Sequence, residues 1–352
     1  MSSQWMIYGA NGYTAQLAIE KAVSNGLHPI LAGRNAAAVE TLAERHGLES
    51  RIFGLDKPEE INAQLADIEV LSHCAGPYSA TAEPMMRACI ASQTHYTDIT
   101  GEIDVFLLSQ SLDAEATGAG IVLCPGVGFD VIPTDCVAAK LKEAMPDATE
   151  LDLGFKGAAS LSPGTAKTMV EAISEGMKVL RNGEILAVSP SFDARSVDFG
   201  SGPVSATVIP WGDLATAYWQ TGIPNISVYT PGKSSKAQDL ILPLIQTAMK
   251  STKLQGMVKK RIQKRVTGPD EASRAQSPTL VWGEARNALG QSLTCRVETP
   301  NGYTVTMDGI LLSAEFLLQY DGAGGCFTPA QLMGADVVER LPGTSELSLS
   351  ET

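Results

Sequence analysis

A glycine turn between an apolar strand and a helix stands near the start of the chain and constrains its fold more than any other feature. Residues 5–8 have the pattern of a buried strand, and Gly9, Gly12 and Ala15 follow at the spacing Gly-x-x-Gly-x-x-Ala. Gly9 permits a tight turn, Gly12 leaves room for a diphosphate at the helix N-terminus, and Ala15 lets the helix pack close to the strand. This pattern predicts a dinucleotide-binding domain.

Short apolar runs alternate with helical patterns as far as Cys124, which is typical of a parallel sheet covered by helices. The predicted strands cover residues 5–8, 29–32, 51–53, 70–74, 95–99 and 121–124. Helices are predicted from residue 12, over 36–46, from 58, over 82–92 and over 103–117. We therefore expect an α/β fold with an N-terminal Rossmann domain over residues 1–130.

The pattern changes after Gly126, where the predicted strands become longer and more polar. They cover residues 151–155, 204–209, 279–284 and 293–298, and helices are predicted over 164–181 and 238–265. This mixture predicts a second, α+β domain over 131–300 for substrate binding or dimerisation. Helices over 305–318 and 329–341, within a segment 301–342, are expected to pack back on the first domain. The Ser, Glu and Thr-rich tail 343–352 is expected to fray.

The end of the second predicted strand indicates which nicotinamide cofactor is bound. An NAD-binding domain usually has Asp or Glu there to hold the ribose 2′-hydroxyl. This chain has Arg34 and Asn35 instead. A guanidinium can pair with a 2′-phosphate, and no carboxylate repels that group. The sequence therefore predicts NADP(H).

A second turn follows the strand over 70–74, at a point that lies beside the nicotinamide in this fold. Gly76 would allow a close backbone approach, Pro77 would stiffen the turn, and Tyr78 could stack on or border the nicotinamide. A purely structural turn is the alternative. The predicted cofactor-binding residues are Gly9, Ala10, Asn11, Gly12, Tyr13, Thr14, Arg34, Asn35, Ala75, Gly76, Pro77 and Tyr78.

Several of these motifs together resemble one known family, the saccharopine dehydrogenase-like NADP-binding oxidoreductases. The matching segments are Gly9–Ala15, Ala32–Arg34, Ala75–Tyr78, Ala88–Cys89, His95–Asp98, Thr100–Glu102, Pro125–Asp135, Thr328–Ala330, Gly334 and Arg340–Leu341. The branch of trans-acting enoyl reductases and saccharopine dehydrogenase-like proteins is the most similar. The resemblance implies a homodimer formed through the sheet of the second domain. Two departures are His73, where many members have Asn, and the segment 79–83, which lacks an expected glycine.

Acidic and phenolic residues follow the predicted strands over 95–99 and 121–124. Tyr96, Asp98 and Asp130 are the candidate catalytic residues, because such groups at the ligand edge could orient a substrate or relay a proton. Glu102 and Asp135 lie nearby. The alternative is that these carboxylates cap helices or bond between domains, with Asp98 or Glu102 capping the helix over 103–117 and Asp135 the next one.

Three further patterns have weaker functional interpretations. Tyr229 and Lys233 have the spacing of the short-chain dehydrogenase pair, but Pro231 and Gly232 lie between them, so they would not share a helical face. The segment 162–167 opens a helix where Thr165 and Lys167 could hold an anion, although an ordinary cap explains it as well. The basic cluster over 259–265 is more typical of a solvated face than of an anion site.

Composition excludes several other classes of protein. The chain has 352 residues, of which 44% are apolar, and a formal net charge of -13, which disfavours nucleic acid as a partner. Six cysteines without a CxxC pair and four histidines predict no metal site. No signal peptide is evident, and the apolar run 310–318 is too short to span a bilayer. We expect a cytoplasmic protein with reduced cysteines.

The sequence as a whole predicts an NADPH-dependent oxidoreductase that transfers a hydride to a C=C, C=N or C=O bond of a small molecule. The acidic or neutral crevice motifs disfavour an amino-acid diacid, and an apolar acyl or isoprenoid-type substrate is an alternative. A catalytically silent NADP-binding sensor or assembly protein is the alternative from a different class. A possible homodimer is the only protein partner that we predict.

Overall fold

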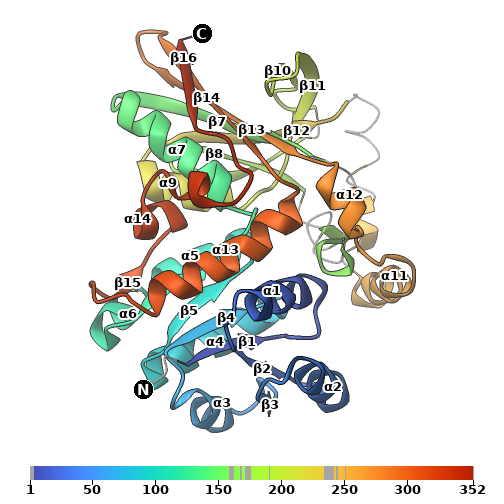
Figure 1. Cartoon of the computed structure of the whole chain (residues 1–352). Helices are drawn as coiled ribbons and strands as arrows, with labels where there is room; N and C mark the ends of the chain where they lie inside the picture. The colour runs from blue at the N-terminus through green and yellow to red at the C-terminus, as the bar shows by residue number, and fades with distance from the viewer. Residues whose placement is uncertain are drawn as a thin grey trace. The chain divides into compact units, whose positions relative to one another are not determined.

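Two compact units make up the chain in the computed structural model (Figure 1). The structure describes residues 4–157, 162–166, 169–170, 176–189, 191–233, 242, 245–249 and 251–351, with the side chains of 252, 253, 263 and 264 left out. The first unit comprises Met1–Ile132 and Tyr303–Gly334. The second comprises Pro133–Gly302 and Ala335–Thr352. The fold class predicted from the sequence, a Rossmann domain followed by an α+β domain, is confirmed.

The first unit is built on a seven-stranded sheet whose neighbouring strands are parallel. The strand order is β15-β6-β5-β4-β1-β2-β3. The strands are β1 (Trp5–Tyr8), β2 (Ile30–Gly33), β3 (Ser50–Ile52), β4 (Val70–His73), β5 (His95–Asp98), β6 (Val122–Cys124) and β15 (Gly325–Cys326). Four consecutive buried residues form each of β1, β2 and β4, as expected for strands covered on both faces.

Helices connect these strands in the order that the sequence predicts. They are α1 (Tyr13–Ser24), α2 (Ala36–His46), α3 (Pro58–Leu65), α4 (Tyr78–Ser92), α5 (Ile103–Ser111) and α6 (Asp113–Ala119). The helix α4 begins at Tyr78, four residues before the predicted start. The single helix predicted over 103–117 is wrong, because the chain leaves helical geometry at Leu112 and divides into α5 and α6.

The C-terminal segment of the first unit adds α13 (Gly302–Leu317), β15 and α14 (Pro329–Met333). β15 pairs with β6, and its two residues carry too little pattern for a sequence prediction. Thr328 and Gln331 form a capping box at the start of α14. The continuous helix predicted over 329–341 is wrong, because Gly334 adopts a φ of 101° and separates α14 from the 3₁₀ helix η1 (Val337–Arg340).

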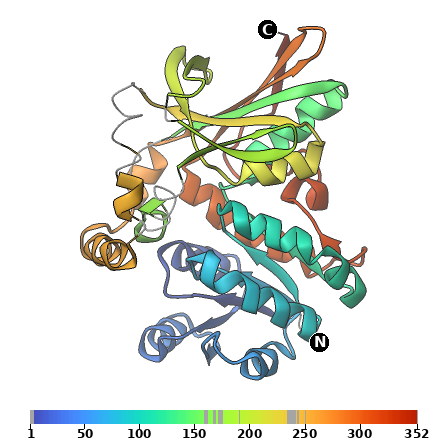
Figure 2. The same ribbon diagram turned by 180° about the vertical axis from the view of Figure 1, so that it is seen from behind.

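The second unit contains a mixed nine-stranded sheet, visible from the opposite side in Figure 2. Seven strands follow the order β10-β11-β12-β7-β13-β14-β16, with β8 joined to β12 and β9 to β8. The strands are β7 (Ala148–Lys156), β8 (Met177–Arg181), β9 (Glu184–Val188), β10 (Arg195–Asp198), β11 (Pro203–Val208), β12 (Asn225–Pro231), β13 (Thr279–Asn287), β14 (Ser292–Thr299) and β16 (Ser348–Glu351). Helices of this unit include α7 (Ile132–Ala144), α9 (Asp213–Thr221), α11 (Thr252–Arg265) and α12 (Glu271–Ala275).

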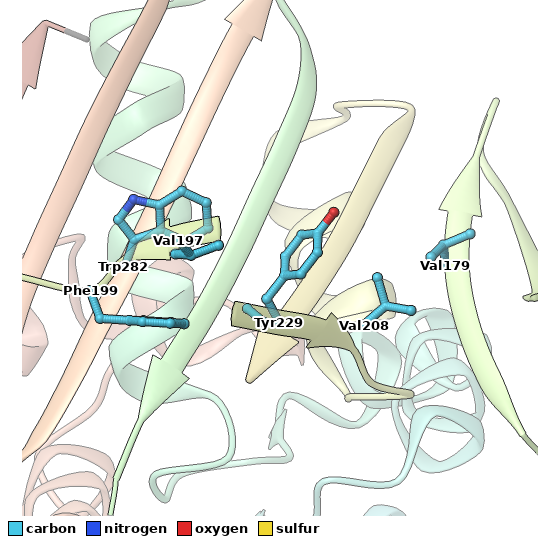
Figure 3. Close-up of a cluster of buried hydrophobic side chains, with 7 residues drawn as sticks. Val179, Val197, Phe199, Val208, Tyr229 and Trp282 are labelled. Atoms are coloured by element: carbon cyan, nitrogen blue, oxygen red, sulfur yellow. The ribbon is translucent and has the colours of Figure 1, made fainter. Parts of the chain in front are cut away.

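The two faces of this sheet pack differently. On one face α7 approaches β13 so closely that a β-carbon on Gly283 would lie 2.5 Å from Val137 Cγ1. On the other face a cluster of aromatic and β-branched side chains surrounds Trp282 and Tyr229 (Figure 3). The ring of Phe199 meets that of Trp282 edge-on at 6.1 Å. Because successive residues of β13 point to opposite faces of the sheet, this strand contributes to two separate apolar layers.

Two predictions for the second unit are wrong. The helix predicted over 164–181 does not extend to its end, because Met177–Arg181 forms β8. Asn182 and Gly183 both adopt positive φ and form the tight turn between β8 and β9, so the Asn-Gly pair was an overlooked hairpin signal. The tail predicted to fray over 343–352 instead contains β16, which pairs with β14. Ala335–Thr352 also belongs to the second unit.

No described helix has both the length and the hydropathy needed to cross a lipid bilayer. Within the same residues, no group of three or more metal-ligating side chains is gathered. All six cysteines are free thiols.

Candidate dinucleotide-binding site

The glycine turn after β1 has the geometry that its sequence predicts. Gly9 adopts a φ of 84°, and a β-carbon there would lie 2.8 Å from the backbone nitrogen of Ala75. The N–H groups of Gly9 and Ala10 donate to the carbonyl of Ala32 at 2.8 and 3.1 Å. Because both the backbone conformation and the space exclude a side chain, only glycine fits this position. The turn ties the ends of β1, β2 and β4 together.

The N-terminus of α1 is left open by the protein's own side chains. Its N-cap is Gly12, which offers no side-chain hydrogen bond, and the first turn contains no acidic residue. A β-carbon on Gly12 would lie 3.1 Å from the carbonyl oxygen of Gly9. The backbone N–H groups of this first turn and the positive end of the helix dipole suit an anionic group such as a diphosphate.

The end of β2 presents an arginine to solvent. Arg34 is exposed, and among the described residues it makes no hydrogen bond or ion pair. Burial raises the pKa of the Tyr8 phenol to about 12, and the positive charge of Arg34 acts in the opposite direction. Asn35 is the N-cap of α2 and accepts a hydrogen bond from the Ala38 N–H at 3.2 Å. Of the two predicted contacts, Arg34 has its head group available and Asn35 has a structural role.

Tyr13 and Tyr78 lie at the starts of two helices but in different surroundings. The Tyr13 ring is half-buried and meets the ring of Tyr303 on α13 edge-on at 5.2 Å. Tyr78 is 8% exposed, and its hydroxyl donates to the carbonyl of His73 at 3.1 Å. Burial raises the pKa of Tyr78 well above its usual value. Since the Tyr78 ring points into the domain, the expected stacking on a nicotinamide is not what this geometry favours.

The turn that precedes α4 contains a cis peptide bond between Gly76 and Pro77. The Thr81 hydroxyl reaches back to this turn and donates to the carbonyl of Ala75 at 2.8 Å. The ring Nε2 of His73 lies 3.1 Å from the same hydroxyl. Burial lowers the pKa of His73 to about 3, so its ring is neutral and structural. It faces Tyr8 and Tyr78 inside the domain rather than the ligand edge.

Glu102 occupies the N-terminus of α4. Its two carboxylate oxygens accept hydrogen bonds from the N–H groups of Tyr78 at 2.9 Å and Ser79 at 2.6 Å. The backbone N–H of Glu102 in turn donates to the Thr100 hydroxyl at 3.1 Å. The sequence suggested Glu102 as a cap for the helix that follows it, whereas it caps a helix 24 residues earlier. Sequence spacing gives no signal for such a long-range cap.

Tyr96 and Asp98 form a buried pair at the end of β5. The Tyr96 hydroxyl donates to Asp98 at 2.7 Å, and the N–H groups of Thr100 and Gly126 donate to the other carboxylate oxygen, each at 2.9 Å. Burial raises the pKa of Asp98 to about 6 despite these hydrogen bonds, and it also raises the pKa of Tyr96. The pair holds the loop after β5 to the loop after β6.

Asp130 differs from this pair in being half-buried. Its carboxylate borders Gly101, where a β-carbon would lie 3.0 Å from an Asp130 oxygen. The neighbouring Phe129 N–H donates to the hydroxyl of Thr306 on α13 at 3.0 Å. Of the three candidate catalytic residues, Asp130 has the most accessible side chain.

The loops after β1, β2, β4, β5 and β6 all leave the carboxyl ends of parallel strands, which meet at one edge of a sheet. The predicted cofactor and catalytic residues of the first unit therefore gather at that edge. Thr306 and Tyr303 also contact it, from a segment far along the chain that no local pattern connects to the site.

The weaker sequence signals lie in the second unit. Ser162 Oγ accepts a hydrogen bond from the Thr165 N–H at 3.2 Å, as an ordinary cap would, and Lys167 lies outside the described residues. Tyr229 lies on β12, so it shares no helical face with Lys233. Asp135 is buried in the first turn of α7.

These features define the first unit as a dinucleotide-binding domain of the Rossmann type. The family model of the saccharopine dehydrogenase NADP binding domain matches residues 5–122. This match confirms the resemblance and the NADP cofactor predicted from the motifs.

Curated relatives match less than half of the chain. A trans-acting enoyl reductase of Mycobacterium tuberculosis is 28% identical over 187 residues, which cover 48% of this chain and 44% of that protein. A saccharopine dehydrogenase-like oxidoreductase of Pongo abelii is 25% identical over 150 residues, with coverages of 37% and 35%. The match spans less than half the length of these relatives.

Solved structures share the fold over the whole chain. Apo saccharopine dehydrogenase (L-Glu forming) from Saccharomyces cerevisiae has a TM-score of 0.67 at 13% identity and is covered completely, as is this chain. Homospermidine synthase from Legionella pneumophila in complex with NAD has a TM-score of 0.65 at 9% identity, with 100% of this chain and 92% of that one covered. At these identities the likeness concerns the fold.

Proposed function

We infer that this protein is an NADPH-dependent oxidoreductase that transfers a hydride to a C=C, C=N or C=O bond of a small molecule. The main support for this proposal is the uncapped N-terminus of α1 beside Arg34, in a domain that matches an NADP-binding family. The relatives named as reductases and oxidoreductases support the redox chemistry. The nicotinamide supplies or accepts the hydride, and the protein supplies placement and electrostatics.

We assign the diphosphate to the glycine turn and the α1 N-terminus, with Gly9, Gly12 and the neighbouring backbone N–H groups. Arg34 pairs with the 2′-phosphate, because it is the exposed cation at the end of β2. The turn over 75–77 borders the nicotinamide. Asp130 is the best-placed proton relay among the three candidates, since Tyr96 and Asp98 bond to each other inside the domain.

The acidic character of the nicotinamide end constrains the substrate. Glu102 fills the N-terminus of α4, and Asp130 lies next to Gly101. Carboxylates repel other carboxylates, so this edge of the first unit disfavours a polycarboxylate substrate. A neutral substrate, such as an apolar acyl or isoprenoid-type molecule, fits these charges better.

The cofactor assignment is tested by replacing Arg34 with Ala and measuring NADPH and NADH affinities by calorimetry. We expect NADPH affinity to fall by about 10–100-fold, the value of about 1.5–3 kcal/mol for a charge-assisted hydrogen bond, while NADH affinity stays unchanged. Arg45→Ala, at an exposed arginine of the same helix region, is the matched control and should change neither. Equal wild-type affinity for the two cofactors would refute the assignment.

A second function, NADP binding without catalysis, is favoured by the burial of Tyr96, Asp98 and Tyr78. The two functions separate when the protein and NADPH are mixed with lipid extracts or with polar metabolite pools. A reductase oxidises NADPH with one of the pools. A sensor or assembly protein binds NADPH and consumes none with either.

A further inference from the structure

One helix of the second unit carries a positive charge that is unusual for this chain. Six of the 26 Lys and Arg residues lie within the fourteen residues of α11, and none of the 39 Asp and Glu residues does. The chain as a whole has a net charge of -13. Such a concentration of one sign on a protein of the opposite sign creates a local field for an anionic partner.

The exposed cations of α11 have no ionic partner in the described part of the chain. Lys260, Arg261 and Arg265 are exposed, and they form no ion pair or hydrogen bond among the described residues. They lie at helical spacing on one side, since Arg265 follows Arg261 by four positions. A helix that served only the packing of its own unit would gain nothing from this arrangement.

An apolar side chain stands in the middle of this charged face. Met257 is 63% exposed and precedes Lys260 and Arg261 by three and four residues, so it is their direct neighbour on the helix surface. Leu254, Val258 and Ile262 are half-buried at a spacing of four and adjoin this charged face along one side. Met257 differs from these three apolar residues in being mostly exposed.

We propose that the outer face of α11, formed by Met257, Lys260, Arg261 and Arg265, docks on the surface of an anionic lipid membrane. Long basic side chains around an exposed apolar residue match a helix that lies in the interface, with the cations at the headgroups and the apolar side chain among the upper acyl carbons. A flat, diffuse layer of negative charge complements cations that have no fixed partner. An acidic protein is the competing occupant, but it gives no role to the exposed Met257.

This inference is independent of the cofactor site, although it agrees with an apolar substrate under the proposed function. A protein that collects such a substrate gains from residence at a lipid surface. Loss of NADPH binding would refute the proposed function and leave the docking surface standing, and the reverse also holds.

The test is sedimentation of the full-length protein with vesicles of phosphatidylcholine alone or containing about one third phosphatidylglycerol. We expect binding only to the anionic vesicles, and loss of that binding when NaCl rises from about 0.1 to about 0.5 M. The triple variant Lys260→Glu, Arg261→Glu, Arg265→Glu should lose at least about tenfold in partitioning. Met257→Ser should weaken binding to the anionic vesicles at about 0.1 M NaCl, where the wild type binds.

A charge-matched control reverses Arg45, Lys57 and Arg87, three exposed cations of the first unit. This variant should bind vesicles like the wild type, and all variants should keep the wild-type melting temperature within a few degrees. Equal binding by the two triple variants, or no wild-type binding to anionic vesicles, would overturn the proposal. In the latter case an acidic protein is the remaining occupant.

Discussion

The N-termini of α1 and α4 lie at the same edge of one parallel sheet, yet the protein treats them in opposite ways. The first turn of α1 has no acidic residue and a glycine N-cap that makes no side-chain hydrogen bond. At α4, the Glu102 carboxylate accepts from two backbone N–H groups. A helix N-terminus attracts anions, so one end is left for a ligand while the other is neutralised by the chain itself.

Because of this difference, the charge along this edge of the sheet changes from positive near α1 to negative near α4. Arg34 reinforces the positive side near α1, whereas Glu102, Asp98 and Asp130 lie on the β5 and β6 side. A dinucleotide with its phosphates toward α1 and its nicotinamide toward α4 matches this gradient. The oxidised nicotinamide ring is a cation, so carboxylates at that end also favour hydride donation by NADPH.

The largest effect on NADPH affinity is expected from placing a carboxylate at the N-terminus of α1, as Glu102 is placed at α4. Gly12→Asp places a carboxylate against the site of the diphosphate, and a like charge at about 4 Å costs about 4 kcal/mol at a protein surface. NADPH affinity should therefore fall about 1000-fold in a calorimetric titration. Gly118→Asp, at a helix position with open space, is the control and should leave the affinity unchanged.

The next effect concerns the buried carboxyl of the acidic side. Burial raises the pKa of Asp98 from 3.8 to about 6, so the unfolded state ionises first as pH rises. Below about pH 4, Asp98 does not lower the free energy of unfolding. Between pH 4 and 6 it lowers this free energy increasingly, and above pH 6 the reduction stays constant at about 3 kcal/mol. The free energy of unfolding of the wild type should fall across that window relative to Asp98→Asn.

Denaturant unfolding at several pH values checks this, with the Asn variant as the reference that lacks the titration. Asp213, whose pKa burial raises to about 7, is present in both proteins and cancels. A constant difference between the two proteins from pH 4 to 7 would mean that Asp98 is ionised throughout.

A smaller effect is expected from opening α4. Glu102→Ala removes the carboxylate from the helix N-terminus and should lower the free energy of unfolding by about 1–2 kcal/mol. NADPH affinity should change little, because α1 and Arg34 hold the phosphates. Glu83→Ala on the exposed side of α4 is the control. A drop in affinity as large as that of Gly12→Asp would show that both helices serve the cofactor.

The sequence predicted the first unit well because its signals are local. The turn at Gly9, the arginine after β2 and the buried runs of β1 and β4 each depend on neighbours within a few residues. The roles of Glu102 and Thr306 could not be predicted, since they connect residues 24 and 177 positions apart. The burial of Tyr78 also escaped, because a helix start does not reveal which way the first side chain turns.

The second unit was less predictable for a related reason. Its strands pair over long separations, as β14 with the C-terminal β16. All four residues of β16 are exposed, and Leu349 is the single apolar residue among them, so the strand has no buried face to mark it. The Asn182–Gly183 pair is a local turn signal, but the helical pattern that precedes it predicts a helix up to residue 181 instead of a hairpin.

The most direct test of this account is a crystal structure of the protein with NADPH. We expect the diphosphate on the backbone N–H groups after Gly9, the 2′-phosphate against Arg34, and Glu102 still bonded to Tyr78 and Ser79. A phosphate at the N-terminus of α4, with Glu102 displaced, would contradict it.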